Sequence, residues 1–409
     1  MADTAYDASL TVPVDAVDAG WLVRRLARVL LSRIAIGRLT IQTPTGLRVA
    51  SAQRAPGPDA VLILHRWRAL RALLIGGDVR FGESYMDGDW TTPDLPSLIE
   101  LAARNAETLN RSIEGHALAR LLKRFAHWRN ANTKSGSKRN IEYHYDLGNA
   151  FYAEWLDPGM SYSSALYPPG VETLDDAQTA KQDRAIALLR IDGPARVLEI
   201  GCGWGGLAER IAATTDARVD GLTLSAAQLA FARDRVARTG LADRAAFHLR
   251  DYRDETGTYD RIVSIEMLEA VGESYWPSYF AAIRDRLRAG GRAVLQGITI
   301  HEDHYDDYRR CTDFIQHYIF PGGMLPTQTE MRRQAEAAGM KVESAEFFGL
   351  DYARTLDAWR KRFHAAWSAI EPMGFDTRFR RMWDYYLAYC EGGFRAGAID
   401  VGLYVLAKP

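Results

Sequence analysis

The sequence contains few cysteines, no long apolar run and almost no net charge. Its three cysteines, Cys202, Cys311 and Cys390, stand too far apart for a zinc motif or a disulfide framework, so we expect a reducing compartment and no metal site. No segment approaches the ~20 consecutive apolar residues that span a bilayer. The net charge of −1 excludes an overall electrostatic field that would attract nucleic acid.

The composition and the first residues indicate a globular protein of the cytoplasm. Hydrophobic residues make up 47% of the chain and charged residues 25%, as is usual for globular proteins. Residues 1–20 are acidic and lack the apolar core of a secretory signal peptide. The 409 residues are many for one domain, so we expect two compact units.

The first unit, residues 1–98, has the pattern of a small α+β domain. Residues 21–36 place apolar side chains on one helical face and arginines away from it. Short alternating segments follow at 39–44 and 61–65, separated by proline and glycine turn signals.

Residues 99–140 begin as a helical stretch and end as a polar linker. Between Arg111 and Arg139, eight basic residues stand against a single acid, Glu114, with leucine and aromatic residues among them. A solvated basic face is one explanation. Attraction to anionic lipid head groups is the other, because each basic residue near such a surface contributes ~1 kcal/mol. The second explanation predicts peripheral membrane association.

The remaining domain, 141–409, is predicted to be α/β, with a doubly wound, mostly parallel sheet covered by helices on both faces. From about residue 191, expected strands at 196–200, 218–224, 245–251, 259–265 and 291–298 alternate with expected helices at 205–213, 225–239 and 275–288. Two late strands, 341–349 and 398–408, enclose a long helical insertion at about 352–397.

The segment VLEIGCGWGG, residues 197–206, ends the first expected strand of that sheet in a glycine-rich turn. In a doubly wound sheet the ligand lies at the carboxyl ends of the strands, and glycines let the backbone approach it closely. A dinucleotide site is the obvious alternative. However, the spacing E-x-G-x-G-x-G-G differs from G-x-G-x-x-G, and Glu199 would repel a pyrophosphate. A cationic, zwitterionic cofactor such as S-adenosylmethionine (SAM) fits better.

Longer motifs occur in order along the chain: YHYDLGNAFYAEWLDPGMSYSSALY, LEIGCGWGG, GLTLSAAQ, IVSIEMLEAVG, DFIQHYIFPGGMLP and YYLAYCEGGFRAG. Together they resemble the cyclopropane-fatty-acyl-phospholipid synthase family, whose shorter relatives are the mycolic-acid methyltransferases. The resemblance runs from about residue 20 to the end. It implies a SAM-dependent methyltransferase fold and an enzyme that adds a carbon from SAM to the double bond of an unsaturated phospholipid acyl chain, which becomes a cyclopropane.

The resemblance also implies which residues contact the cofactor. They are Tyr162 and Ser163 in the loop before the sheet, Glu199, Gly201, Cys202, Gly203, Trp204, Gly205 and Gly206 beneath the methionine part, Thr223, Leu224, Ser225 and Gln228 on the ribose side, Asp251 and Tyr252 beside adenine, and Ile265 at the end of the fourth strand. We interpret Cys202 as a small residue that fits the turn.

Methylation of an alkene leaves a carbocation, which must lose a proton before water captures it. The site therefore needs a water-poor pocket, a negative or π-rich wall, and a base. Core packing also explains aromatic stripes of the kind found here. The candidates for the wall are Trp359, Phe363, Trp367, Trp383, Tyr385, Tyr386 and Tyr389.

By the same resemblance, Glu269 and Tyr352 match two residues that hold a bicarbonate ion, the proposed proton acceptor. A plain helix carboxylate is the alternative for Glu269. Ser164 replaces a family cysteine, and its backbone N–H is implied to make the contact. Gln296 replaces a family histidine, and its amide can bond to bicarbonate but cannot become charged. That change leaves a methylene- or methyl-branched chain open as the product.

Three further points stay open. Cys390 stands at a family cysteine and is a candidate site residue, although methyl transfer needs no thiol and packing explains it equally. A methyltransferase for a free small molecule would need neither the basic segment nor the N-terminal domain, and the glycine turn argues against an inactive lipid-binding protein. The double-bond position, the head group and the oligomeric state, a homodimer included, are not determined by the sequence.

Overall fold

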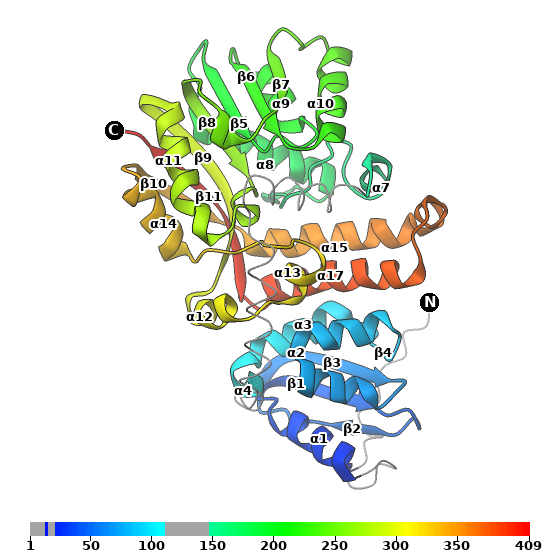
Figure 1. Cartoon of the computed structure of the whole chain (residues 1–409). Helices are drawn as coiled ribbons and strands as arrows, with labels where there is room; N and C mark the ends of the chain where they lie inside the picture. Colours follow the sequence, from blue (N-terminus) through cyan, green and yellow to red (C-terminus); the bar gives the residue numbers. More distant parts are fainter. Residues whose placement is uncertain (1–12, 15–20, 111–146) are drawn as a thin grey trace. The chain divides into compact units, whose positions relative to one another are not determined.

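The computed structural model describes residues 13–14, 21–110 and 147–409, and the chain divides into two compact units (Figure 1). Unit 1 combines Met1–Leu121 with Phe375–Ala398, and unit 2 combines Leu122–Gly374 with Ile399–Pro409. The basic segment from Arg111 to Arg139 lies outside the described residues.

Unit 1 is built on a small sheet with strand order β2-β1-β3-β4, in which β1 is antiparallel to β2 and parallel to β3. Its elements are α1 (Trp21–Ser32), β1 (Ile36–Gln42), β2 (Arg48–Ala50), β3 (Ala55–Leu64), α2 (Arg68–Met86), β4 (Trp90–Thr91), α3 (Leu95–Arg104) and α4 (Ala106–Asn110). The two alternating segments of the sequence thus form its central strands. The domain boundary that the sequence predicted at residue 98 lies inside α3.

A helix from far along the chain completes unit 1. Helix α17 (Thr377–Arg395) packs on α2 and α3. The hydroxyl of Tyr85 donates a 2.6 Å hydrogen bond to Oδ2 of Asp384, and a Cβ at Gly392 would lie 2.7 Å from the side chain of Ile99. This close approach requires glycine. The sequence placed the whole insertion in the methyltransferase domain, whereas the structure groups α17 with the N-terminal residues.

Unit 2 contains a seven-stranded sheet with the order β10-β11-β9-β8-β5-β6-β7. Strands β9, β8, β5, β6 and β7 are parallel, and β11 and β10 join antiparallel at one edge. The strands are β5 (Arg196–Ile200), β6 (Arg218–Thr223), β7 (Ala245–Leu249), β8 (Tyr259–Ile265), β9 (Leu287–Ile300), β10 (Lys341–Phe347) and β11 (Ile399–Ala407). The strand order reverses at β5, so a ligand is expected at its carboxyl end.

The alternation that the sequence predicted is found in three helices of unit 2, which span residues 206–214, 226–238 and 276–286 (Figure 1). The α-helices are α7 (Asn149–Ala153), α8 (Leu174–Leu189), α9 (Gly206–Thr214), α10 (Ala226–Arg238), α11 (Trp276–Arg286), α12 (Glu302–Arg310), α13 (Phe314–Tyr318), α14 (Gln328–Ala337), α15 (Gly349–Ala365) and α16 (Trp367–Ile370). Short 3-10 turns are η3 (Tyr252–Asp254), η4 (Leu268–Ala270), η5 (Glu273–Tyr275) and η6 (Glu371–Met373).

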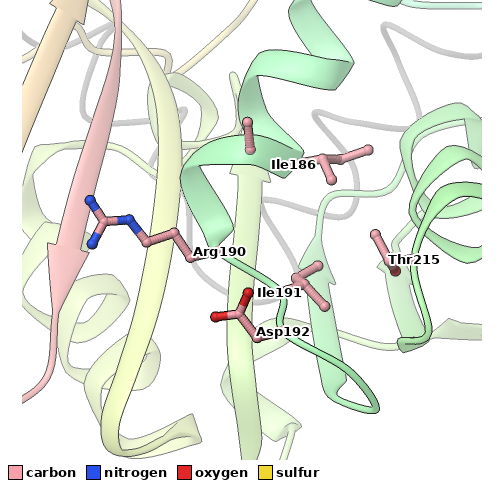
Figure 2. A pocket seen from close by; sticks show the side chains of 6 residues that line it. Ile186, Arg190, Ile191, Asp192 and Thr215 are labelled. Atoms are coloured by element: carbon pink, nitrogen blue, oxygen red, sulfur yellow. The ribbon is translucent and has the colours of Figure 1, made fainter.

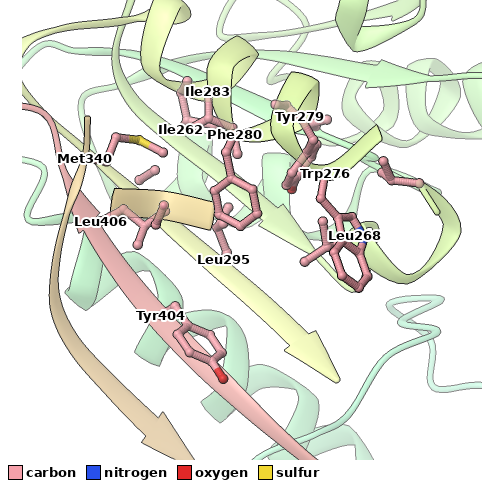
Figure 3. Close-up of a cluster of buried hydrophobic side chains, with 14 of the residues drawn as sticks. Ile262, Leu268, Trp276, Tyr279, Phe280, Ile283, Leu295, Met340, Tyr404 and Leu406 are labelled. Carbon is pink, nitrogen blue, oxygen red and sulfur yellow. The ribbon is translucent and has the colours of Figure 1, made fainter. Parts of the chain in front are cut away.

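Two apolar clusters pack against this sheet, and neighbouring residues of one strand belong to different clusters. Val197 of β5 belongs to one cluster and Leu198 to the other, as side-chain alternation along a strand requires. The cluster of Leu198 also holds Trp276, Tyr279 and Phe280, which α11 places on one face (Figure 3). Helices therefore cover both faces, which confirms the predicted α/β architecture.

The helices within the described ranges are all too short or too polar to cross a bilayer.

Candidate functional site

The glycine turn between β5 and α9 has the backbone of a ligand cradle. Gly201, Gly203 and Gly205 have φ angles of +82°, +52° and +81°, which side chains rarely adopt. Added Cβ atoms at Gly201, Gly205 and Gly206 would lie 2.8 to 2.9 Å from neighbouring protein atoms. A Cβ at Gly203 would meet nothing within 4 Å. Packing therefore explains three of the four glycines, and Gly203 alone faces open space.

Glu199, near the end of β5, carries a buried carboxyl group beside this turn. Its side chain is 3% exposed, and Oε2 has no hydrogen-bond partner among the described residues. Burial raises the pKa of Glu199 to about 8, although the buried ammonium of Lys181 opposes that shift. A buried carboxyl group with an unpartnered oxygen favours the binding of a cationic ligand.

The predicted ribose residues form a bonded cluster at the end of β6. Thr223 donates through Oγ1 to Oε1 of Gln228 at 2.8 Å, and Ser225 caps α10 by accepting from the Gln228 backbone N–H at 3.3 Å. Leu224 lies between them in the turn. These bonds fix the shape of the β6–α10 turn, and the contacts of its residues with a cofactor remain a prediction.

The predicted adenine residues follow β7. The carboxylate of Asp251 accepts from Arg253 Nε at 2.8 Å and from its Nη2 at 2.6 Å, and it caps η3, which begins at Tyr252. Ile265 is the last residue of β8, as expected. Cofactor contact remains a prediction for these three residues.

Trp204 and Cys202 hold the turn in place. The indole Nε1 of Trp204 donates to Asn149 Oδ1 at 2.8 Å, and its ring centre lies 5.2 Å from that of Tyr152. Cys202 is buried, and its backbone N–H donates to Leu222 O at 2.8 Å. Burial also raises the pKa of the Cys202 thiol, which agrees with its interpretation as a packing residue.

An aromatic group surrounds Tyr162 in the loop before α8. The ring centre of Tyr162 lies 5.4 Å from Tyr152, 5.6 Å from Trp155 and 5.4 Å from Trp359. Trp359 on α15 also lies edge-on to Tyr352, at 6.1 Å. A π-rich wall thus links the loop before α8 to Tyr352.

The other expected aromatic residues divide between the units. Phe363 and Trp367 remain near this group, with ring centres 5.7 Å apart. Those on α17 belong to unit 1, where they contribute to its packing; they are Trp383, Tyr385, Tyr386 and Tyr389. Cys390, also on α17, belongs to unit 1 rather than to the unit that holds Glu269.

Three donors that the sequence assigned to a bicarbonate ion converge on the carboxylate of Glu266. Tyr352 donates its hydroxyl to Oε2 at 2.6 Å, and Gln296 donates Nε2 to Oε1 at 2.7 Å. The backbone N–H of Ser164 donates to the same Oε1 at 2.8 Å. Glu266 was not predicted as a site residue. The one feature of the sequence that could have indicated it is a charged residue directly after β8, at the carboxyl edge of the sheet.

The backbone of Glu266 is strained. Its φ angle is +48°, a conformation that costs a non-glycine residue on the order of 1–3 kcal/mol. Its N–H donates to Gln296 O at 2.8 Å, which fixes it beside β9. Strain of this kind gathers at functional sites.

Glu269 lies one turn further on and behaves differently. Its Oε1 accepts from the Ile298 backbone N–H at 2.6 Å, and Oε2 has no hydrogen-bond partner among the described residues. Burial and the nearby charge of Glu266 raise the pKa of Glu269. Because Glu266 accepts three hydrogen bonds and Glu269 one, the ionised form is favoured more strongly at Glu266 than at Glu269.

Lys181 on α8 is a second residue that sequence reasoning missed. Its Nζ donates to the Ser163 hydroxyl at 2.6 Å, and the residue is 3% exposed. Burial lowers the pKa of Lys181, while Glu266, Asp157 and Glu199 raise it. The ammonium group of Lys181 therefore offsets the negative charge of the site's carboxylates. Its hydrogen bond also engages the hydroxyl group of Ser163.

A separate hollow of about 380 Å³ lies beside the segment that joins α8 to β5 (Figure 2). Ile186, Arg190, Ile191, Asp192 and Thr215 line it. It lies at the amino end of β5, opposite the edge that carries the glycine turn and Glu266. The hollow is therefore separate from the site.

Comparison with known proteins shows the family to which the chain belongs. The family model described as mycolic acid cyclopropane synthetase matches residues 132–403, well over half of the chain. The chain belongs to the mycolic acid cyclopropane synthetase family. The resemblance seen in the motifs is thereby confirmed.

Two relatives match this chain over most of its length. Tuberculostearic acid methyltransferase UfaA1 of Mycobacterium tuberculosis is 39% identical over 90% of this chain and 86% of its own. Cyclopropane-fatty-acyl-phospholipid synthase of Escherichia coli is 35% identical over 97% of this chain and 95% of its own.

Solved structures support the same fold. Mycolic acid cyclopropane synthase CmaA1, complexed with SAH and CTAB, is 30% identical, has a TM-score of 0.62, and covers 66% of this chain and 98% of its own. Coclaurine N-methyltransferase, at 19% identity and a TM-score of 0.62 over 81% of this chain and 99% of its own, shows the fold alone. This family member is a SAM-dependent methyltransferase.

Proposed function

We propose that this enzyme transfers a methyl group from SAM to a double bond of an unsaturated acyl chain in membrane phospholipid, and that a cyclopropane is its product. The observation that carries the proposal is the carboxylate of Glu266, which three donors hold beside the aromatic group of Tyr162 and Trp359. A carbocation formed from an alkene needs such a wall and such an anion. The E. coli relative, matched along 97% of this chain, supports the lipid substrate.

The residues present fit SAM. The carboxyl group of Glu199 has an unpartnered buried oxygen for an ammonium group, and Gly203 leaves space where a side chain would intrude. SAM supplies an electrophilic methyl group when it is bound. Tyr162 and Trp359 exclude water and stabilise the cation through their π faces, and Glu266 supplies the opposing charge.

A branched product is the second candidate, and the bonding of Glu266 favours it. Three hydrogen bonds stabilise the anion and oppose the rise in its pKa that burial causes, so it accepts a proton less readily than it would without them. Slower proton loss gives a hydride time to shift to the neighbouring cationic carbon. Loss of a methyl proton then gives a methylene branch, an isomer of the cyclopropane. Reduction to a methyl branch would need a separate hydride donor.

Binding to an anionic membrane surface in the cytoplasm is part of the same proposal. The basic residues from Arg111 to Arg139 support it by their charge. This segment lies outside the described residues, so its support comes from the sequence alone.

Product analysis tests the proposed function. The purified enzyme and SAM are incubated with vesicles of dioleoyl phosphatidylglycerol, with saturated dimyristoyl phosphatidylglycerol as the matched control. We expect adenosylhomocysteine release with the unsaturated lipid alone, and upfield ring protons in the proton NMR spectrum of the product. Vinylidene protons in that spectrum would show instead that the product is the methylene-branched chain. Equal release with the saturated lipid would overturn the proposal.

A further inference from the structure

Three of the residues that were expected to bind bicarbonate, Tyr352, Ser164 and Gln296, have no hydrogen-bond donors left for it. The single hydroxyl proton of Tyr352 and the single backbone proton of Ser164 both go to Glu266. The amide of Gln296 has two protons; one goes to Glu266 at 2.7 Å and the other to Ser164 O at 3.3 Å. Every donor of these three residues is therefore in use.

A free anion would also meet charge of its own sign. Glu266 is partly buried, its three hydrogen bonds favour the ionised carboxylate, and like charges in such a setting repel strongly. The carboxylate of Glu266 has the same planar arrangement of two oxygens as bicarbonate and accepts from the same three groups. The site as folded does not fit bicarbonate.

We propose that the Glu266 side chain takes the place of bicarbonate and is this chain's own proton acceptor. This inference rests on the proposed function. In the step it describes, the methyl–sulfur bond breaks and the alkene electron pair forms a new carbon–carbon bond. A C–H bond of the transferred carbon then breaks. Its electron pair closes the ring or, once a hydride has shifted from the methylated carbon to the neighbouring cationic carbon, forms the branch double bond, and the proton moves to a carboxylate oxygen of Glu266.

The backbone and the neighbouring charges agree with this role. Glycine would be unstrained at a φ of +48°, so the glutamate side chain is kept at an energetic cost. Burial raises the pKa of Glu266, which makes it a better base than an exposed carboxylate. Burial and the charge of Glu266 raise the pKa of Glu269, which opposes a second charge beside Glu266.

Replacement of Glu266 by glycine tests the inference directly. The change removes the carboxylate, frees the three donors and relieves the strained backbone, so the fold should persist. We expect turnover in carbonate-free buffer to fall at least ~100-fold, the usual contribution of a general base. Added bicarbonate or formate should restore much of it. Glu266→Gln, which keeps the shape without the base, should be equally slow and should not be rescued.

Direct binding gives a readout that needs no lipid turnover. In ¹³C NMR with labelled bicarbonate, Glu266→Gly should broaden or shift the bicarbonate signal and the wild type should not. The matched control is Arg190→Gly, since Arg190 also has a φ of +48° but lies at the amino end of β5. It should neither bind bicarbonate nor lose turnover. Binding by the wild type would overturn the inference.

The two proposals can fail separately. Wild-type turnover that falls when dissolved carbonate is removed would overturn the role of Glu266 and leave the lipid substrate intact. Full turnover by Glu266→Gln in carbonate-free buffer would do the same. A wild type that releases no adenosylhomocysteine with unsaturated vesicles, yet shows the expected binding contrast, would overturn the lipid substrate and support the replacement of bicarbonate.

Discussion

Tyr352 and Glu266 are joined by a 2.6 Å hydrogen bond although they lie 86 residues apart in the chain. The bond links α15, in the insertion, to the end of β8 in the sheet. It stabilises the Glu266 carboxylate in its charged form and lowers its pKa against the opposing effect of burial. The protonation of Glu266 therefore depends on the position of α15.

Replacement of Tyr352 by phenylalanine should raise the pKa of Glu266 and slow the enzyme. A hydrogen bond to a charged group contributes ~1.5–3 kcal/mol, so kcat should fall by ~10-fold or more. Activity needs ionised Glu266, so the acidic limb of the kcat–pH profile should move to higher pH. Tyr305→Phe on α12 is the control. A lower kcat with an unmoved limb would indicate a packing role for Tyr352.

The space at Gly203 predicts a selective loss of cofactor binding. Gly203→Ala should place its methyl group where SAM lies and weaken binding in a calorimetric titration. Its positive φ adds a backbone cost of ~1–2 kcal/mol. Gly240→Ala is the matched control, because Gly240 also has positive φ and nothing within 4 Å. Both variants should melt at similarly reduced temperatures; unchanged SAM affinity in Gly203→Ala would refute the placement of the cradle.

Local pattern was sufficient to predict much of the sheet. The apolar runs at 196–200 and 259–265 coincide with β5 and β8, because strand pattern is a property of neighbouring residues. Helix α2 (Arg68–Met86) was missed, since its paired glycines, one of them non-helical at Gly77, resemble a loop. The amphipathic pattern of α17 indicated that it packs, but not that its partner is the N-terminal unit.

The centre of the site could not be predicted in the same way. Glu266 receives its donors from residues 102, 30 and 86 positions away, and a linear pattern does not encode such convergence. Lys181 lies among polar residues of α8 and resembles a surface lysine, yet it is 3% exposed. Tertiary packing alone distinguishes these two residues from ordinary surface charges.

The state of Glu199 predicts a pH-dependent stability. Its pKa is raised to about 8 in the folded protein, from 4.5 for the ordinary group. Between these values the unfolded chain releases a proton that the folded protein keeps, so the free energy of unfolding should fall as pH rises. The slope approaches ~1.4 kcal/mol per pH unit for one group. Urea titrations at pH 6, 7 and 8 should show this decline, and Glu199→Gln should flatten it; equal slopes would contradict the assignment.

The basic segment predicts salt-dependent attachment to lipid. Sedimentation with vesicles of phosphatidylglycerol should weaken as sodium chloride rises, because screening shortens to ~8 Å at physiological ionic strength. Replacement of Lys123, Arg124 and Arg129 by glutamine should release the protein, since each basic residue contributes ~1 kcal/mol near an anionic surface.

A matched loss of charge elsewhere separates this attraction from a change in net charge. The control replaces three basic residues outside the segment by glutamine; these are Arg332, Arg333 and Lys341. If both triple variants lose sedimentation equally, overall charge governs binding and the segment has no special role. If neither does, the basic residues form a solvated face. Release by the first variant alone, with SAM affinity unchanged, would assign membrane attachment to the segment, because a folding defect would disturb the cofactor site as well.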